Sequence, residues 1–127
     1  MRTLILLAHG SRRHESNQEV ITLTDEVRNK AKDIYESVEY AFLELAEPEL
    51  LYAIENSVKQ GATEITVLPY FLNSGNHVKQ DIPAIIDTAM EKYPHCKFNV
   101  TICIGMYEGM AELILNHASE SSLKLSS

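Results

Sequence analysis

The stretches Thr3–Ala8 (TLILLA) and Glu64–Leu72 (EITVLPYFL) decide the fold, because each is apolar almost throughout. Continuous apolar runs of this length are typical of strands that are buried on both faces of a sheet. Two further segments, Ser37–Leu45 and Lys97–Gly105, alternate apolar with polar or small residues and predict strands with one more exposed face. The burial patterns therefore favour the strand order 2-1-3-4, in which the first and third strands are central.

In the segments between these strands, apolar residues recur at helical spacing, which predicts amphipathic helices. The first helix is expected over about Ser16–Ile34, and the second between Pro48, which suits a first turn, and Gly61, which suits a C-terminal stop. After the third strand we expect a polar loop, Asn73–Gln80, and then a third helix that Pro94 closes. A last short helix is marked by Met110, Leu113 and Ile114.

Four strand–helix units in a chain of 127 residues imply one α/β domain, a parallel sheet with helices on both faces. We expect this domain to occupy residues 1–119 and to be followed by a polar tail, residues 120–127. Pro69 falls inside the third predicted strand, although proline removes a donor from the ladder. We therefore place Pro69 near the C-terminal end of that strand, where pairing stops.

Composition excludes several classes of partner. Eleven Lys and Arg against eighteen Asp and Glu give a net charge of −7, which argues against a nucleic-acid partner. No apolar run approaches the roughly 20 residues that span a bilayer, and the N-terminus has no secretory signal pattern. The two cysteines, Cys96 and Cys103, form no disulfide framework, so we expect a cytoplasmic protein without membrane contact.

Three polar side chains follow neighbouring strands of the predicted sheet. His9 comes directly after the first strand, Glu44 lies at the end of the second, and His77 lies in the loop after the third. Ligands of open α/β sheets bind beyond the carboxyl ends of the strands, and neighbouring strands are only about 4.8 Å apart. Two imidazoles and a carboxylate suit a divalent transition metal, and the lack of a fourth ligand indicates an open, working site. Taken singly, each residue is also compatible with an ordinary hydrogen-bonded or solvated role.

Three segments of the sequence look familiar together. LLAHGSR (Leu6–Arg12), AFLELAEPEL (Ala41–Leu50) and VLPYFLNSGNHVKQDIP (Val67–Pro83) occur in this order over the first two-thirds of the chain. In these segments the chain resembles the small sirohydrochlorin chelatases of the CbiX/SirB family, which are related to the class II chelatases. The resemblance implies a single chelatase-like (flavodoxin-like) lobe that pairs as a homodimer.

The same resemblance implies a function and a set of site residues. Family members insert Co²⁺, Fe²⁺ or Ni²⁺ into the tetrapyrrole sirohydrochlorin without ATP or an organic cofactor, on the routes to cobalamin or sirohaem. Co²⁺ is the metal that we expect first, with the metal acting as a substrate. The metal-binding and catalytic histidines of the family fall on His9 and His77, and its site glutamate falls on Glu44.

The substrate implied by the resemblance carries eight carboxylates, so positive groups must line the mouth of the site despite the net negative charge. Arg12, Arg13 and Lys79 fall at the same edge of the sheet, close to the start of the first helix, and Ser11 is a further candidate contact. For Arg13 and Lys79 a purely solvated role is the alternative.

Two other functions are compatible with the same residues. A cobalt or tetrapyrrole carrier would need the same weak, open metal site without turnover. Phosphotransfer at His9, as in the histidine phosphatases, is a remote alternative, because those enzymes place an arginine before the histidine where this chain has Ala8. An assay of metal insertion separates the first alternative from a chelatase.

Overall fold

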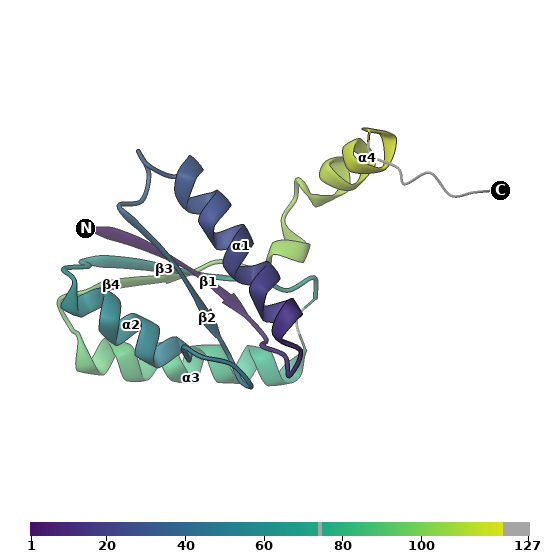
Figure 1. Cartoon of the computed structure of the whole chain (residues 1–127). Helices are drawn as coiled ribbons and strands as arrows, with labels where there is room; N and C mark the ends of the chain where they lie inside the picture. The colour runs from purple at the N-terminus through teal and green to yellow at the C-terminus, as the bar shows by residue number, and fades with distance from the viewer. Residues whose placement is uncertain (74, 121–127) are drawn as a thin grey trace.

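A computed structural model describes residues 1–73 and 75–120 of the chain, except for the side chains of Asn76 and His77. Strands and helices alternate along the sequence (Figure 1). The elements are β1 (Arg2–Ala8), α1 (His14–Lys30), β2 (Ser37–Phe42), α2 (Leu50–Lys59), β3 (Glu64–Pro69), α3 (Asn76–Lys92), β4 (Lys97–Val100), the 3-10 turn η1 (Ile104–Met106) and α4 (Met110–Glu120).

The four strands form one parallel sheet in the order β2-β1-β3-β4, which confirms the predicted order. The last register pairs are Ala8 with Phe42 on one side of β1 and Leu7 with Pro69 on the other. The three strands β2, β1 and β3 therefore end side by side at one edge of the sheet. The segments that follow these strands therefore begin at the same edge of the sheet.

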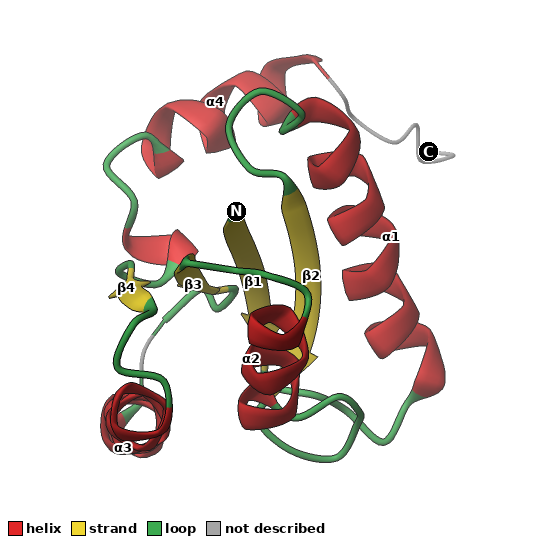
Figure 2. Ribbon diagram, turned by 90° about the vertical axis from the view of Figure 1, so that its left-hand side faces the viewer, coloured by secondary structure: helices red, strands yellow, loops and turns green. Residues whose placement is uncertain are grey.

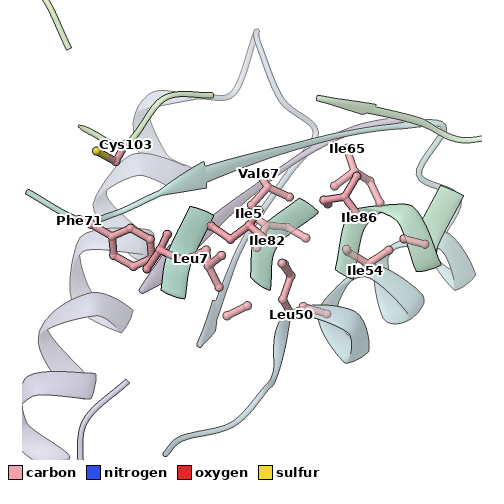
Figure 3. Close-up of a cluster of buried hydrophobic side chains, with 14 of the residues drawn as sticks. Ile5, Leu7, Leu50, Ile54, Ile65, Val67, Phe71, Ile82, Ile86 and Cys103 are labelled. Carbon is pink, nitrogen blue, oxygen red and sulfur yellow. The ribbon is translucent and has the colours of Figure 1, made fainter. Parts of the chain in front are cut away.

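Helices cover both faces of the sheet: α1 lies on one face, and α2 and α3 lie on the other (Figure 2). Successive side chains of β1 point to opposite faces of the sheet, so this one strand contributes to the packing on both faces. Ile5 and Leu7 belong to the core under α2 and α3. Leu4 and Leu6 pack toward α1. The larger core joins all four strands to α2 and α3 (Figure 3). Its fully buried or nearly buried members include Ile5, Leu7, Leu50, Ile54, Ile65 and Val67.

The fourth strand is shorter than the prediction of Lys97–Gly105, and Pro69 gives the reason. The Thr101 N–H donates to the Val67 carbonyl at 3.0 Å, and the next ladder bond would need an N–H from residue 69. Proline has none, so pairing between β3 and β4 stops at this point. Pro69 is the last residue of β3, at the C-terminal end of the predicted strand as expected, and within the described residues Tyr70 keeps only a bond to β1.

The third helix begins earlier than predicted, so the prediction of a polar loop over Asn73–Gln80 is wrong. Gly75 is the N-cap of α3, and its carbonyl accepts a bond from the Lys79 N–H at 3.2 Å. Val78 is buried four residues before the buried Ile82, so the apolar stripe of the helix extends back into the segment that was predicted to be a loop. His77 consequently lies in the first turn of α3 and not in a loop.

Two other helix boundaries also differ from the sequence prediction. Pro48 precedes α2 instead of opening its first turn; the Glu47–Pro48 peptide bond is cis, and Glu49 is the N-cap. The first helix ends at Lys30, because the Ala31 N–H bonds to the Arg28 carbonyl and the chain then turns toward β2.

The last helix stands away from the sheet, as Figure 1 shows. None of its residues from Met110 to Glu120 is buried, although Leu113, Ile114 and Leu115 are apolar. The predicted tail from residue 120 overlaps the end of α4, and residues 121–127 lie outside the described part of the chain. Within the described ranges, no helix is both long and apolar enough to cross a bilayer.

Candidate metal site at the sheet edge

His9 and Glu44 lie on neighbouring backbone segments that continue the pairing of β1 with β2. The Leu43 N–H donates to the Ala8 carbonyl at 2.9 Å, and the Glu44 N–H donates to the His9 carbonyl at 3.1 Å. Glu44 therefore follows the end of β2 by two residues but remains tied to the His9 backbone. The edge of the sheet thus brings the backbones of these two residues together.

Gly10 makes this close approach possible. Its φ angle is +91°, a left-handed conformation that side chains disfavour. A Cβ atom at this position would lie only 1.8 Å from the backbone carbonyl oxygen of Glu44. The absence of a side chain at Gly10 therefore lets the segment after β1 lie directly against the segment after β2.

The imidazole of His9 is exposed to solvent on one side and rests on the ring of Phe71 on the other. The ring centroids are 4.2 Å apart, with a tilt of 37° between the planes. Phe71 is itself buried, and its backbone is fixed because the Gly105 N–H donates to the Phe71 carbonyl at 2.9 Å. On the other side of Phe71, the Tyr70 N–H donates to the Leu7 carbonyl at 2.7 Å. A rigid apolar platform thus holds the His9 ring at the rim of the sheet.

Phe71 was missed in the sequence because the run Glu64–Leu72 was read as one continuous strand. The available signal was Pro69, since a proline that ends pairing leaves the next residues free to turn toward the site. Asn17 was missed as well: its side-chain amide donates to the Ser11 carbonyl at 2.8 Å, and its side-chain oxygen accepts from the Ser11 N–H at 2.9 Å. This reciprocal pair fixes the loop between β1 and α1.

Of the other two predicted metal-site residues, the structure describes the side chain of Glu44 but not that of His77. Glu44 is exposed, and within residues 1–73 and 75–120 its carboxylate has no hydrogen-bond or ion-pair partner. His77 opens α3 at the same edge, but its side chain lies outside the described part. Among the described side chains, no three histidine, cysteine or acidic residues are grouped closely enough to hold a metal ion.

The candidate substrate contacts lie around the same edge. The Ser11 hydroxyl oxygen accepts a bond from the Arg13 N–H at 3.0 Å, and the Arg13 guanidinium is 3.7 Å from Glu15 with both side chains largely exposed. Such a surface pair contributes little to stability, so Arg13 is available to another anion. Arg12 and Lys79 are exposed, and neither side chain is paired within the described residues.

The molecule is thus an α/β protein with a parallel sheet in the order 2-1-3-4, and an exposed imidazole and an exposed carboxylate follow its strands at one edge. Comparison with known proteins gives the family. The CbiX family model matches residues 3–121, and the chain belongs to this family.

Relatives of two lengths are similar to this chain. A sirohydrochlorin cobaltochelatase of Priestia megaterium is 34% identical over 125 residues, which are 98% of this chain and 40% of that protein. A CbiX protein from Marinobacter aquaeolei has a solved structure with a TM-score of 0.78 and 28% identity, and the match covers 94% of this chain and 96% of that one. The chelatase SirB from Bacillus subtilis subspecies spizizenii, solved with cobalt, has a TM-score of 0.79 and 32% identity over 94% of this chain and 50% of SirB.

The chain therefore spans about half or less of the length of the two named chelatases, and nearly all of the Marinobacter protein. The structural matches confirm the chelatase-like α/β fold that the resemblance implied.

Proposed function

We propose that this chain forms a chelatase that inserts a divalent metal into sirohydrochlorin or a closely related tetrapyrrole without ATP. Co²⁺ is the metal that we propose first, and Fe²⁺ and Ni²⁺ are the alternatives. The observation that carries the proposal is the His9 imidazole, which is exposed at the sheet edge, supported by Phe71 and tied through its backbone to the Glu44 segment. The names of the Priestia and Bacillus relatives support a chelatase over phosphotransfer.

The chemistry of insertion requires that two pyrrole N–H protons leave while the metal exchanges its ligands. A neutral imidazole binds a late divalent metal, and an imidazole near neutral pH also accepts protons. In this proposal His9 and His77 present the metal, and one of them passes protons toward Glu44. Imidazole and carboxylate ligands suit Co²⁺, Fe²⁺ and Ni²⁺ alike, so the metal supply of the cell contributes to the choice.

A site that delivers its metal must hold it loosely. Four protein ligands close a structural site, whereas a working site keeps positions open for water or substrate. Two imidazoles with water completing the coordination shell satisfy this requirement, and the exposure of His9 leaves room for the macrocycle above the ring.

The decisive assay for this function is repeated turnover. We expect metal-free sirohydrochlorin and Co²⁺ to give the cobalt product, followed by visible absorbance, in amounts well above one product per protein chain. A yield that stops at one metal per chain would identify a carrier, and no spectral change above the rate without protein would overturn the proposal.

The positive side chains at the edge lead to a salt prediction. Arg12, Arg13 and Lys79 are exposed, while the substrate is polyanionic and the chain has a net charge of −7. Raising the ionic strength from about 0.05 to about 0.5 M should weaken sirohydrochlorin binding by about tenfold, because screening shortens the reach of these charges. Binding is measured by absorbance titration without metal. The double variant Arg12→Gln and Arg13→Gln should flatten the salt dependence, and a parent affinity independent of salt would contradict this role.

Two apolar surfaces of the chain support a homodimer as the working form. Leu113, Ile114 and Leu115 of α4 are 59%, 58% and 67% exposed. On the face of the sheet that carries α1, a mostly apolar groove of about 280 Å³ lies beyond β3, with Leu68, Ile104 and Tyr107 among its lining residues. We propose a second copy of the chain as the occupant of the α4 face. Among residues 1–73 and 75–120, nothing buries this helix or covers the groove, and both belong to the same lobe.

The dimer is tested at α4. We expect the double variant Leu113→Glu and Ile114→Glu to sediment as a monomer at concentrations at which the parent is a dimer, because buried charges would face the partner. Ser119→Glu, which adds a charge elsewhere on the exposed helix, should leave the dimer intact. A parent chain that is monomeric at working concentration, or a double variant that remains dimeric, would contradict this assembly.

The proposed place of action is the reducing cytoplasm. Both cysteine thiols, Cys96 and Cys103, are free, which supports this compartment.

A further inference from the structure

A second cavity lies beside the candidate metal site, at the β4 edge of the sheet. Its volume is about 430 Å³, within the range of small-molecule sites. It opens between the first turns of α3 and the segment that runs from β4 into η1. We call it the β4-edge pocket, and its lining includes Val78, Lys79, Ile82, Val100, Cys103 and Met106.

The pocket lies next to the segment that carries the platform under His9, because Pro69 lines the pocket and Phe71 follows two residues later. Phe71, whose ring supports the His9 imidazole, belongs to the same buried cluster as Val78, Ile82 and Cys103. The strand β4 lies two strands from β1, and two strand spacings amount to about 10 Å. This spacing is on the scale of the distance from the centre of a tetrapyrrole to its outer substituents.

The chemistry of the pocket points to an apolar ligand that carries negative charge. Val100 at the β4 edge is 43% exposed and Met106 is 63% exposed, so the apolar walls reach the solvent. Lys79 is the charged residue of the lining, and its side chain is unpaired within residues 1–73 and 75–120. An apolar slot beside one unpaired ammonium suits an aromatic ring edge with a carboxylate substituent.

We infer that the β4-edge pocket is a subsite for one pyrrole edge of the tetrapyrrole, with Lys79 pairing with a carboxylate of that ring. The inference rests on the proposed function and adds the direction in which the macrocycle lies. The substrate extends from the His9 side of Phe71 toward β4, which leaves its central nitrogens near the rim where the metal is presented. A second copy of the chain seated in the pocket is the competing occupant.

Two variants and two matched controls test this subsite. Met106→Trp places a larger side chain at the mouth of the pocket, and Met90→Trp adds the same group at an exposed methionine of α3 outside the lining. Lys79→Gln removes the pocket charge, and Lys59→Gln removes one from α2. The readout is the Kd of metal-free sirohydrochlorin, measured by absorbance titration, together with the sedimentation of each variant and its thermal unfolding.

We expect Met106→Trp to raise the Kd of sirohydrochlorin by about tenfold, because the added volume competes with the ring. Lys79→Gln should raise it by about two- to fivefold, as expected for one largely exposed ion pair. Both controls should bind as the parent does. If Met106→Trp fails to fold, Val100→Trp, at the exposed β4 wall of the same pocket, takes its place with the same expected rise in Kd.

Each remaining result has a separate meaning. A parent that binds sirohydrochlorin and inserts metal, together with unchanged Kd values in Met106→Trp and Lys79→Gln, overturns the subsite and leaves the proposed function standing. Loss of the dimer in Met106→Trp with unchanged sirohydrochlorin affinity assigns the pocket to an interface between copies and also overturns the subsite. A parent that neither binds sirohydrochlorin nor inserts metal overturns the proposed function and the subsite with it.

Discussion

Replacing His9 with alanine is expected to lower the rate of metal insertion into sirohydrochlorin by at least about 100-fold, the scale on which a positioned acid–base group contributes. The loss follows from the proposed double role of the imidazole as metal ligand and proton acceptor. The fold should persist, because His9 is exposed and its main side-chain contact is the ring of Phe71. The free energy of unfolding should fall by no more than about 1.5 kcal/mol, the worth of one aromatic pair.

The measurement compares kcat/KM for Co²⁺ insertion with stability from urea unfolding. His95→Ala is the matched control, because His95 is also exposed but lies after α3, at the opposite end of the strands from His9. The control should retain the parent rate. If His9→Ala keeps the kcat/KM of the parent, His9 has no role in the mechanism, whatever rate the His95→Ala control shows.

The second large effect is expected from Gly10→Ala. The new Cβ would lie 1.8 Å from the Glu44 carbonyl oxygen, and backbone cannot move aside as a flexible side chain can. The φ angle of +91° adds strain of about 1–2 kcal/mol for a residue with a side chain. We expect a loss of stability of about 2–4 kcal/mol and a drop in activity of at least about tenfold, because the His9 and Glu44 segments must separate.

Gly61→Ala separates the effect of the positive φ angle from that of the close contact with Glu44. Gly61 also has a positive φ, +105°, but an added Cβ would meet no atom within 4 Å. This control should therefore lose only the strain energy, about 1 kcal/mol, and keep full activity. Equal losses of stability and activity in the two variants would show that the close contact with Glu44 is not what matters at Gly10.

Much of the fold could be predicted from the sequence because burial leaves a direct pattern in a parallel sheet. Thr3–Ala8 and the first part of Glu64–Leu72 are apolar on both faces, and these strands are the central ones. Cys103, which follows β4, is buried in the main core. Local chemistry accounts for the errors: Pro69 ends the pairing of β4 with β3, and Gly75 caps α3 ahead of the first obvious apolar residue.

The site was predicted less completely because it depends on contacts between segments that are distant in sequence. The motif residues His9 and Glu44 could be placed at one edge from strand order alone. The ring of Phe71 under His9 arises from a turn after β3 that no periodicity marks. The β4-edge pocket likewise forms between α3 and the segment after β4, so it has no signature in either segment by itself.

The central claim is that His9 and His77 together present a loosely held metal, and Co²⁺ binding tests it most directly. Titration with Co²⁺ in the absence of tetrapyrrole should give visible absorption bands of imidazole-bound cobalt in the parent. His9→Ala and His77→Ala should each lose these bands and bind Co²⁺ at least about tenfold more weakly, whereas His95→Ala should match the parent. Cobalt spectra and affinities that are identical in all four proteins would contradict the account.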